Sequence, residues 1–410
     1  MKIAYVTVRY GPDIVGGAEQ ACRQLAEHLA ADGVDVSVHT TCAVDAVTWA
    51  DVMAPGRTIE AGVDVHRYRS RSGRDRAFEA YSSAVLQDPA HQPPDVEQRW
   101  LDRQGPVCPD AVAGAASSGA DLVVCTPYLY WPTVETIATV GPKVVLHPAA
   151  HDEAPIRLPI FARTFAGARG LAFYTDAERR LVERLWPALV ATPQLVVGLG
   201  IDADAGAAAD PDAFRSSSGL GERPFLLCLG RVDDGKGVRL LARYFATYKR
   251  RRPGPLALVL AGPVVHQPDD HPDVIVTGPL SEADKWSALA AADLFVNPSA
   301  NESFSIVLLE AWAVGRPVLV NARCGATAEH ARRSGGGLAF NGYATFEACL
   351  DRVLGDPLIG AALGRAGRDY VQRSFTWPVV TTRYRGWLER LAGASESRER
   401  RVPSGSLEES

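Results

Sequence analysis

Two segments in the second half of the chain contain the residue types that phosphate-binding sites use. The first is "GRVDDGKG", Gly230 to Gly237, which directly follows the apolar run "PFLLCL". A strand, a glycine-flanked turn and a lysine that opens a helix are how phosphate-binding loops are built. The octet fits the triphosphatase pattern G-x-x-x-x-G-K-[ST] except at Gly237, where a hydroxyl should hold Mg²⁺. The segment therefore predicts a phosphate site and raises the question of whether it serves a triphosphatase.

The second segment is "NPSANESFSIVLLEAWAVGRPVLVN", which contains two glutamates. Glu302 is expected in a loop after the strand "DLFV", and Glu310 in the apolar helix that follows. A buried carboxylate is costly unless it is hydrogen-bonded, and a ribose diol is a suitable partner. The alternative interpretation of Glu310 is an ion pair with Arg316.

The backbone amides of residues 303–306 are expected at the N-terminus of that helix, near the carboxyl end of a parallel sheet, where anions bind well. Arg231 adds a planar guanidinium that can donate two parallel hydrogen bonds, and Lys236 adds a compact positive charge. Together these groups predict a diphosphate site in one domain. The alternative for Arg231 and Lys236 is a solvated turn.

Short apolar runs alternate with helix-like segments along the chain, which is typical of a parallel sheet covered on both faces. The runs in the first half are "KIAYVTV", "DVSVHTT", "ADLVVCT" and "KVVLHP", with a helix expected from about Ala18 to Asp32. The alternation restarts with "FLLCLG", "LALVLAG", "DLFVNPS" and "PVLVN". The α/β chain is therefore predicted to contain two doubly wound, Rossmann-like domains.

Composition predicts the domain boundaries. Residues 201–223 are rich in Ala, Asp, Ser and Gly and are predicted to be a linker. The domains are expected at 1–200 and 224–375. An amphipathic helix at about 376–393 could return to the first domain, and the tail 395–410 has no apolar face and is predicted to be disordered.

Charge and cysteine content exclude several classes of protein. The chain has 410 residues and a net charge of −5, which argues against a nucleic-acid binder. Seven cysteines without C-x-x-C spacing indicate reduced thiols in a cytoplasmic protein. The N-terminus does not resemble a secretory signal, and no apolar run approaches the ~20 residues of a membrane span. The arginine-rich run Arg67 to Arg76 is predicted to be a solvated loop, so any contact with the inner face of a membrane is expected to be peripheral.

The order of "GRVDDGKG", "ESFSIVLLEA" and "GRPVLVNARCGATAE" resembles the retaining nucleotide-sugar glycosyltransferases of family 4, which have the GT-B fold. The resemblance covers nearly the whole chain, including Gly16 and Gly17 after the first strand, "HPAAHDEAPIRLPIF" and "FTWPVVTTRY". It implies two Rossmann-like domains that face a central cleft, with a C-terminal crossover helix. The chain departs from the family at Ser305, where glycine is usual, and in "CGATAE", which has one glycine where two are common.

The resemblance also implies roles for individual residues. Arg231 and Lys236 would hold the donor diphosphate and stabilise the departing nucleotide. Glu310 would bind the ribose, and Glu302 would contact hydroxyls of the transferred sugar. The other implied contacts are phosphate or sugar at the amides of Phe304, Ser305 and Ile306, close backbone approach to donor and acceptor at Gly16 and Gly17, and the C6 side of the sugar at His151.

The expected reaction is transfer of a hexose, with retention of anomeric configuration, from a nucleoside-diphosphate sugar to a hydroxyl of a glycan, a lipid-linked sugar or a small molecule. The expected catalytic residues are Glu302, Arg231, Lys236 and His151. Two cations and a helix terminus can stabilise the leaving diphosphate, so neither a metal nor another cofactor is expected. The alternatives are an epimerase or phosphorylase of the same fold and a P-loop-like nucleotide-binding protein.

His147 and His151 have the four-residue spacing of a metal pair on a helix. Pro148 directly follows the strand "KVVL", so the two histidines are instead expected at a strand end and in a loop. For His151, a sugar-contacting or acid–base role and a loop-stabilising role both remain open.

Overall fold

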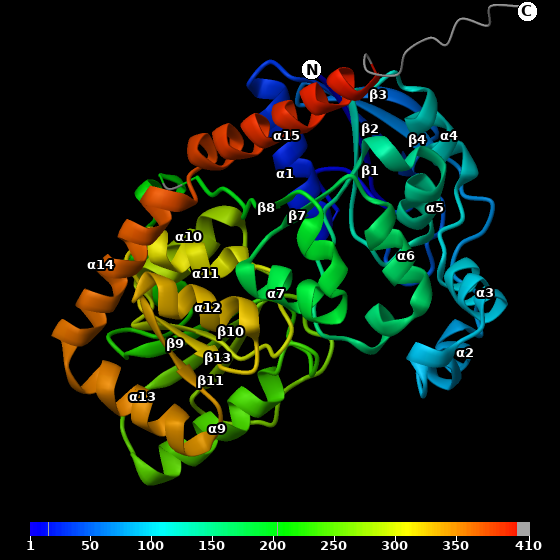
Figure 1. Cartoon of the computed structure of the whole chain (residues 1–410). Helices are drawn as coiled ribbons and strands as arrows, with labels where there is room; N and C mark the ends of the chain where they lie inside the picture. The colour runs from blue at the N-terminus through cyan, green and yellow to red at the C-terminus, as the bar shows by residue number, and fades with distance from the viewer. Residues whose placement is uncertain (15, 203, 400–410) are drawn as a thin grey trace, which may run out of the picture. The chain divides into compact units, whose positions relative to one another are not determined.

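The computed structural model describes residues 1–14, 16–202 and 204–399, which form two compact units (Figure 1). The first unit comprises Met1–Tyr174, Glu178–Val197 and the segment from Thr381 onward, and the second comprises Thr175–Ala177 and Gly198–Val380. Each unit is built on its own parallel sheet flanked by helices. The prediction of two Rossmann-like α/β domains is confirmed.

The sheet of the first unit has eight strands in the order β3-β4-β2-β1-β5-β6-β7-β8. All neighbouring strands are parallel except β3 and β4, which are antiparallel. The direction of strand addition reverses between β1 and β5, which is the topological switch point of this sheet. The strands are β1 (Lys2–Val6), β2 (Asp35–Thr41), β3 (Gly56–Glu60), β4 (Val63–Tyr68), β5 (Leu122–Cys125), β6 (Val144–Leu146), β7 (Gly170–Phe173) and β8 (Gln194–Val196).

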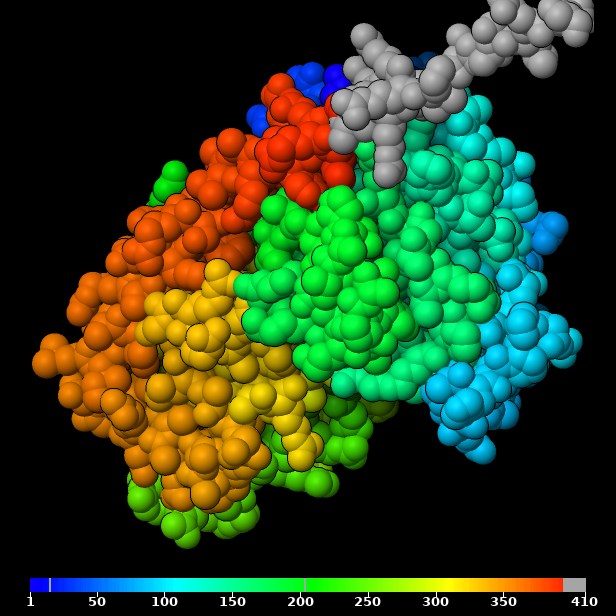
Figure 2. Space-filling model, viewed as in Figure 1, coloured from blue at the N-terminus to red at the C-terminus, as the bar shows by residue number. Residues whose placement is uncertain are grey.

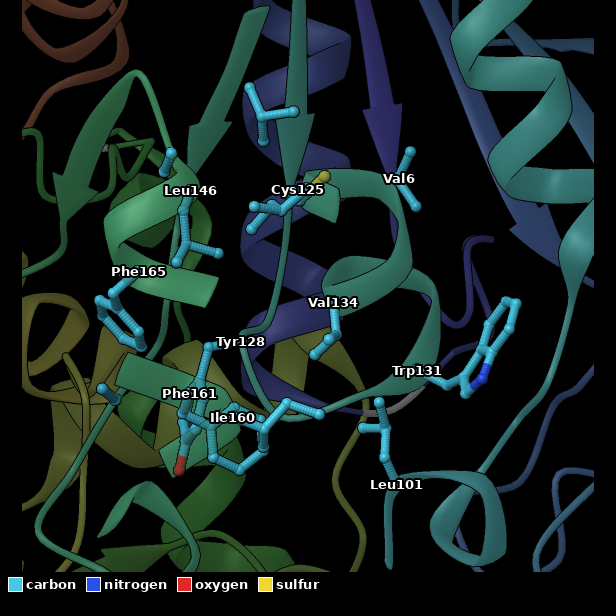
Figure 3. Packing of buried hydrophobic residues seen from close by; sticks show 14 of the residues in the cluster. Val6, Leu101, Cys125, Tyr128, Trp131, Val134, Leu146, Ile160, Phe161 and Phe165 are labelled. Atoms are coloured by element: carbon cyan, nitrogen blue, oxygen red, sulfur yellow. The ribbon is translucent and has the colours of Figure 1, made fainter. Parts of the chain in front are cut away.

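Helices of the first unit pack their apolar residues on this sheet. Figure 3 shows Cys125 and Leu146, from two neighbouring strands, near Val134 and Phe165 of the covering helices. The apolar spacing that predicts the first helix is reproduced, because its buried residues lie on one face. The helices are α1 (Gly17–Ala31), α2 (Phe78–Val85), α3 (Pro94–Gln104), α4 (Pro109–Ser117), α5 (Trp131–Val140), α6 (Pro159–Gly167) and α7 (Asp176–Leu185), of which the first two residues of α7 belong to the second unit.

The second unit has six strands, all parallel, in the order β11-β10-β9-β12-β13-β14. Its switch point lies between β9 and β12. The strands are β9 (Phe225–Leu229), β10 (Ala257–Ala261), β11 (Val274–Gly278), β12 (Leu294–Asn297), β13 (Val318–Asn321) and β14 (Gly337–Phe340). The helices are α8 (Pro211–Ser217), α9 (Val238–Arg251), α10 (Glu282–Ala291), α11 (Ile306–Ala313), α12 (Gly325–Ser334), α13 (Tyr343–Gly355) and α14 (Pro357–Ser374).

The segment 201–223 was predicted to be a linker, but its described residues, 201–202 and 204–223, are folded as part of the second unit. This segment contains α8 and a short 3₁₀ helix, Ala205–Ala208, which both pack on α10. Its small residues permit this packing. A Cβ atom on Gly206 would lie 2.5 Å from Cγ1 of Val314 and 3.2 Å from the Trp286 ring. In this segment the small residues allow close packing on α10. The prediction of a linker, which was based on the same residues, is therefore wrong.

The C-terminal helix α15 (Trp377–Glu399) is longer than the predicted 376–393. The boundary between the two units falls within it, after Val380, so the helix carries the chain back to the first unit. There the Arg169 guanidinium donates to the carbonyl oxygen of Leu391 at 2.7 Å. Of the predicted disordered tail, residues 400–410 lie outside the described residues. Among the helices of the described part, none is long and apolar enough to span a bilayer.

Candidate active site

The predicted phosphate-binding residues lie at the switch point of the second sheet. Residues 230–237 follow β9, and residues 298–305 follow β12, which is the hydrogen-bonded neighbour of β9. Both loops leave the carboxyl edge of the sheet and lead into α9 and α11, respectively. In open parallel sheets, the crevice at this place is where ligands bind. The fold therefore brings together two segments that are far apart in sequence.

Asp233 organises the first loop. Its Oδ1 accepts a hydrogen bond from the backbone amide of Lys236 at 2.7 Å, and its Oδ2 lies 3.3 Å from Nε of Arg231. The Asp233 side chain is buried, whereas that of Arg231 is 58% exposed. The hydrogen-bonded turn thus holds Arg231 by its Nε, and the exposed part of the guanidinium can bind an anion.

Gly237 could not carry the hydroxyl that a triphosphatase loop needs. It has a left-handed backbone with φ 73°, a conformation that side chains with a Cβ adopt at a cost. A Cβ atom at this position would also lie 2.6 Å from the carbonyl oxygen of Pro298 in the second loop. The glycine therefore allows the two loops to approach each other, and the departure from the triphosphatase pattern is structural.

An ion pair connects the two loops. Nζ of Lys236 lies 2.7 Å from Oε1 of Glu302, and the side chains are 34% and 16% exposed, respectively. Both side chains therefore keep some contact with solvent. The structure thus brings the predicted Lys236 and Glu302 into direct contact, and a solvated turn without a partner does not describe Lys236.

The second loop ends at the N-terminus of α11, where Ser305 is the residue before the helix. Ser305 has φ 73°, which explains why glycine is usual at this position in the family that the sequence resembles. Its hydroxyl accepts a hydrogen bond from Nδ2 of Asn297 at 2.9 Å, which helps to hold the strained backbone. Phe304 is buried, and α11 begins at Ile306, so the amides of these residues lie at a helix N-terminus.

Glu310 is buried on α11 and pairs with a residue that the sequence analysis does not identify. Its Oε1 lies 2.7 Å from Nζ of Lys285 on α10, and the two side chains are 9% and 19% exposed. The proposed ion pair with Arg316 is wrong: in the described part of the chain, Lys285 takes that place. Burial raises the pKa of Glu310, and the neighbouring ammonium of Lys285 opposes this shift.

Gly16 and Gly17 belong to the first unit, at the start of α1. A Cβ atom on Gly16 would lie 2.2 Å from Oε2 of Glu19, whereas one on Gly17 would meet no atom within 4 Å. Glu19 is buried and forms an ion pair with the buried Arg9, with Nη2 of Arg9 2.5 Å from Oε1 of Glu19. The two glycines therefore differ: Gly16 leaves room for this ion pair, and Gly17 leaves open space.

His151 also belongs to the first unit, in the loop after β6. Its Nε2 lies 3.3 Å from Oε2 of Glu153, and this contact raises the pKa of the imidazole. Glu153 in turn accepts a hydrogen bond from the hydroxyl of Tyr128 at 2.8 Å. His147 is buried at the strand end, where burial lowers its pKa to about 3 and its Nε2 lies 2.8 Å from the Tyr384 hydroxyl. The expected placement of both histidines is confirmed.

Sequence reasoning misses three residues that shape this site. Asp233 could have been found, since it stands within "GRVDDGKG" and acidic side chains often cap such turns. Asn297 ends β12 and binds both the amide of Ser299 and the hydroxyl of Ser305. Lys285 gives no sequence signal, because it is one charged residue in the amphipathic segment "SEADKWSALAAA".

Residues 223–356 match the model of a protein family described as glycosyl transferases group 1. The matched range includes both loops of the site, with Lys236, Glu302 and Glu310. The match covers about a third of the chain. The matched range lies within the second unit, where the predicted phosphate-binding residues meet.

Two relatives are similar to this chain over different lengths. A mannosyltransferase of Mycolicibacterium smegmatis, described as GDP-mannose-dependent and acting on phosphatidylinositol monomannoside, is 32% identical over 222 residues. That alignment covers 49% of this chain and 56% of the relative, so the match spans about half of each protein. A D-inositol 3-phosphate glycosyltransferase of Saccharomonospora viridis is 29% identical, with 90% of this chain and 88% of the relative covered.

Solved structures show that the fold is GT-B. Sucrose-phosphate synthase of Thermosynechococcus elongatus superposes with a TM-score of 0.69 at 20% identity, covering 96% of this chain and 99% of that one. HepE of Anabaena, solved with UDP and glucose, superposes with a TM-score of 0.65 at 15% identity, covering 97% and 100%. The GT-B fold class predicted from the sequence is confirmed.

Proposed function

We propose that this glycosyltransferase transfers a hexose from a nucleoside-diphosphate sugar to an acceptor hydroxyl, with retention of anomeric configuration. The observation that carries the proposal is the 2.7 Å ion pair between Lys236 and Glu302, which joins two loops at the switch point of the second sheet. The description of the mycobacterial relative, which includes GDP-mannose and a mannosyl transfer, supports a hexose donor.

The diphosphate would bind where the cations and the helix N-terminus meet. Lys236 supplies a point charge, and the exposed guanidinium of Arg231 supplies a fork that suits phosphate oxygens. The amides of Phe304, Ser305 and Ile306 add dipoles at the start of α11. These groups would stabilise the negative charge that develops on the leaving nucleoside diphosphate, and we propose that no metal is needed for that step.

The two glutamates would bind different parts of the donor. Glu302 would accept hydrogen bonds from hydroxyls of the transferred sugar, because it already contacts Lys236 beside the proposed diphosphate position. Glu310 lies one to two turns into α11 and would accept hydrogen bonds from the ribose hydroxyls, with Lys285 as its fixed partner. With these two roles, the transferred sugar would lie at Glu302 and the nucleoside at Glu310, with the diphosphate between them.

In the proposed reaction, the bond between the anomeric carbon and the diphosphate oxygen breaks. The acceptor oxygen bonds to the same face of that carbon, and its proton passes to the departing diphosphate. No covalent enzyme intermediate is needed, so Lys236 and Arg231 act by stabilising charge. The acceptor is a glycan, a lipid-linked sugar or a small molecule, and His151 would contact the transferred sugar.

The test is a transfer assay with purified protein, in EDTA, on a panel of UDP-, GDP-, ADP- and TDP-sugars with sugar, inositol phosphate and lipid-linked acceptors. The expected result is a new glycoside whose anomeric proton coupling, measured by NMR, matches that of the donor. An inverted product would contradict retention, and activity only with added Mg²⁺ would contradict the metal-independent step. Turnover of donor to an isomer without acceptor, or only with free phosphate, would instead identify an epimerase or a phosphorylase.

A further inference from the structure

A cavity lies at the edge of the second unit's sheet that is opposite the Lys236 and Glu302 site. Residues that directly precede β9, β10, β12 and β13 line it, so it opens at the amino-terminal edge of the strands. The Lys236 and Glu302 site lies at the carboxyl-terminal edge of the same sheet. The volume of about 600 Å³ is in the range of small-molecule sites. This cavity is therefore separate from the proposed donor site.

Apolar side chains form most of the cavity wall. They come from the end of α13 and the start of α14, which lie at the surface of the second unit in orange (Figures 1 and 2), and from the loops that enter the strands. The main contributors are Pro224, Pro255, Pro317, Val353, Leu354 and Pro357. Rigid prolines and branched side chains keep such a wall in place with little loss of conformational freedom. The wall suits a compact apolar group.

Arg316 brings to this wall a guanidinium that forms no ion pair within 4.0 Å among the described residues, although the charge of Asp293 in the same wall acts on it. It is half-buried, and its Nε is a buried donor without a hydrogen-bond partner in the described part of the chain. Burial lowers the pKa of Arg316, although a guanidinium remains charged in proteins. A buried donor left without a partner costs about 1–3 kcal/mol, so such a group requires an explanation.

The other charged groups of the cavity already have partners. Nη2 of Arg252 lies 3.2 Å from Oδ2 of Asp351. Oδ2 of Asp293 accepts a hydrogen bond from the amide of Phe225 at 2.8 Å and lies 3.8 Å from Arg215. Among the described residues that line the cavity, Arg316 is thus the cation without an ion pair.

The N-terminus of α14 does not supply the anion-binding groups. Asp356 precedes this helix and caps it, with its Oδ1 accepting a hydrogen bond from the amide of Leu358 at 2.9 Å. The backbone oxygen of Asp356 accepts from the amide of Ile359 at 3.0 Å. An anion in this cavity would therefore be held by Arg316.

We propose that this cavity binds a small organic anion, an apolar group that carries a phosphate or a carboxylate, with the anion against the guanidinium of Arg316. A phosphate or carboxylate can accept two parallel hydrogen bonds from a guanidinium, and the apolar group would cover the wall of prolines and branched side chains. The site is independent of the sugar-transfer reaction and does not share residues with the donor site.

The experiment measures dissociation constants for phenyl phosphate and benzoate by saturation-transfer NMR on the full chain. Arg316→Gln is expected to weaken binding at least about tenfold, which corresponds to about 1.4 kcal/mol. Phenol and inorganic phosphate, which each lack one half of the ligand, are expected to bind at least about tenfold more weakly than phenyl phosphate. Anion binding at Lys236 is expected to be the same in both proteins, because Arg316 does not belong to that site, so the difference between the two proteins reports on the cavity.

Two further variants make the result decisive. Ala361→Trp adds a large ring at an exposed position in the wall and is expected to abolish the part of the binding that Arg316→Gln weakens, while the melting temperature is retained. Arg365→Gln, an exposed arginine of α14 that does not line the cavity, is expected to bind like the wild type. Equal affinity in the wild type, Arg316→Gln and Ala361→Trp would overturn the proposal, as would equal binding of phenol and phenyl phosphate.

Discussion

The ammonium of Lys285 on α10 lies 2.7 Å from Oε1 of Glu310 on α11, and both side chains are largely buried. The same ammonium lies 2.8 Å from Oε2 of Glu282, whose side chain is 81% exposed. Burial alone would lower the pKa of Lys285, but the two carboxylates outweigh it and raise that pKa. The ammonium of Lys285 thereby fixes one oxygen of the buried Glu310 carboxylate and opposes the rise in its pKa that burial causes.

Lys285→Met is expected to weaken binding of the nucleoside diphosphate about tenfold, since a hydrogen bond to a charged group contributes about 1.5–3 kcal/mol. The preference for a ribonucleotide over its 2′-deoxy analogue should shrink in parallel, because Glu310 loses its fixed orientation. Lys285→Arg should restore part of both. Titration calorimetry with the two nucleotides checks this, and Glu282→Gln serves as the control that should bind like the wild type. An unchanged ribose preference in Lys285→Met would show that Lys285 does not position Glu310.

Gly237→Ser is expected to destabilise the protein by about 1–3 kcal/mol, because the serine would need a left-handed backbone and would place Cβ against the Pro298 carbonyl. Gly235→Ser is the matched control, since a Cβ there would meet its nearest atom, Oδ1 of Asp233, at an ordinary 3.5 Å. Urea unfolding of both variants gives the comparison. If Gly237→Ser were as stable as the wild type and hydrolysed ATP with Mg²⁺, the loop would be a triphosphatase loop after all.

Gly16→Ala is expected to disrupt the buried ion pair of Arg9 and Glu19, because the new Cβ would lie 2.2 Å from the Glu19 carboxylate. Breaking a buried ion pair costs about 3–5 kcal/mol when one charge is left alone, so a loss of up to that size is expected in the free energy of unfolding. Gly17→Ala adds a Cβ in open space and should change stability by less than about 0.5 kcal/mol. Equal stability of the two variants would contradict the close approach at Gly16.

His151 is expected to titrate above its ordinary pKa of 6.5, because Glu153 stabilises the imidazolium. A raised pKa means that the folded state binds the proton more tightly than the unfolded state, so the stabilisation is present below pH 6.5 and is lost as the pH rises through the raised value. Glu153→Gln should lower the pKa, measured from the imidazole proton shifts in NMR, and remove this pH dependence. An unaltered titration in Glu153→Gln would refute the assignment of the cause.

The parts of the fold that depend on periodic apolar runs could be predicted from the sequence. Strands β1 and β2 and helix α1 follow from alternating and helical spacing, because burial of one face or of a whole strand determines those patterns. The structure of the segment 201–223 could not be predicted from such spacing. Its small residues lack a period, and only the tertiary structure shows that they pack against α10.

Candidate residues could be identified where the local sequence gives a signal, as at Lys236 and Glu302, and the structure shows these two side chains in contact. Their role in binding a donor stays a prediction. Pairings of residues without such a signal could not be predicted. The pairing of Glu310 with Lys285 requires α10 and α11 to be neighbours, and the run from Arg67 was predicted to be solvated although Arg67 itself is buried in β4. There its guanidinium lies 2.5 Å from Oε1 of Glu60, a partner on the antiparallel strand β3. The arginine-rich composition of this run was visible in the sequence. The burial of Arg67 follows from the pairing of β4 with β3, which the sequence did not show.

The most direct test of the central claim is the effect of Lys236→Met on nucleotide affinity. A thermal-shift screen of UDP, GDP, ADP and TDP in EDTA first identifies the nucleotide, and titration calorimetry then measures its dissociation constant. Arg243→Met, which removes an exposed charge from α9 without touching the crevice loops, is the matched control. The account predicts a loss of about a hundredfold in Lys236→Met, or about 2.7 kcal/mol, and an unchanged value in Arg243→Met. Equal affinity in the two variants and the wild type would contradict a diphosphate site between these loops.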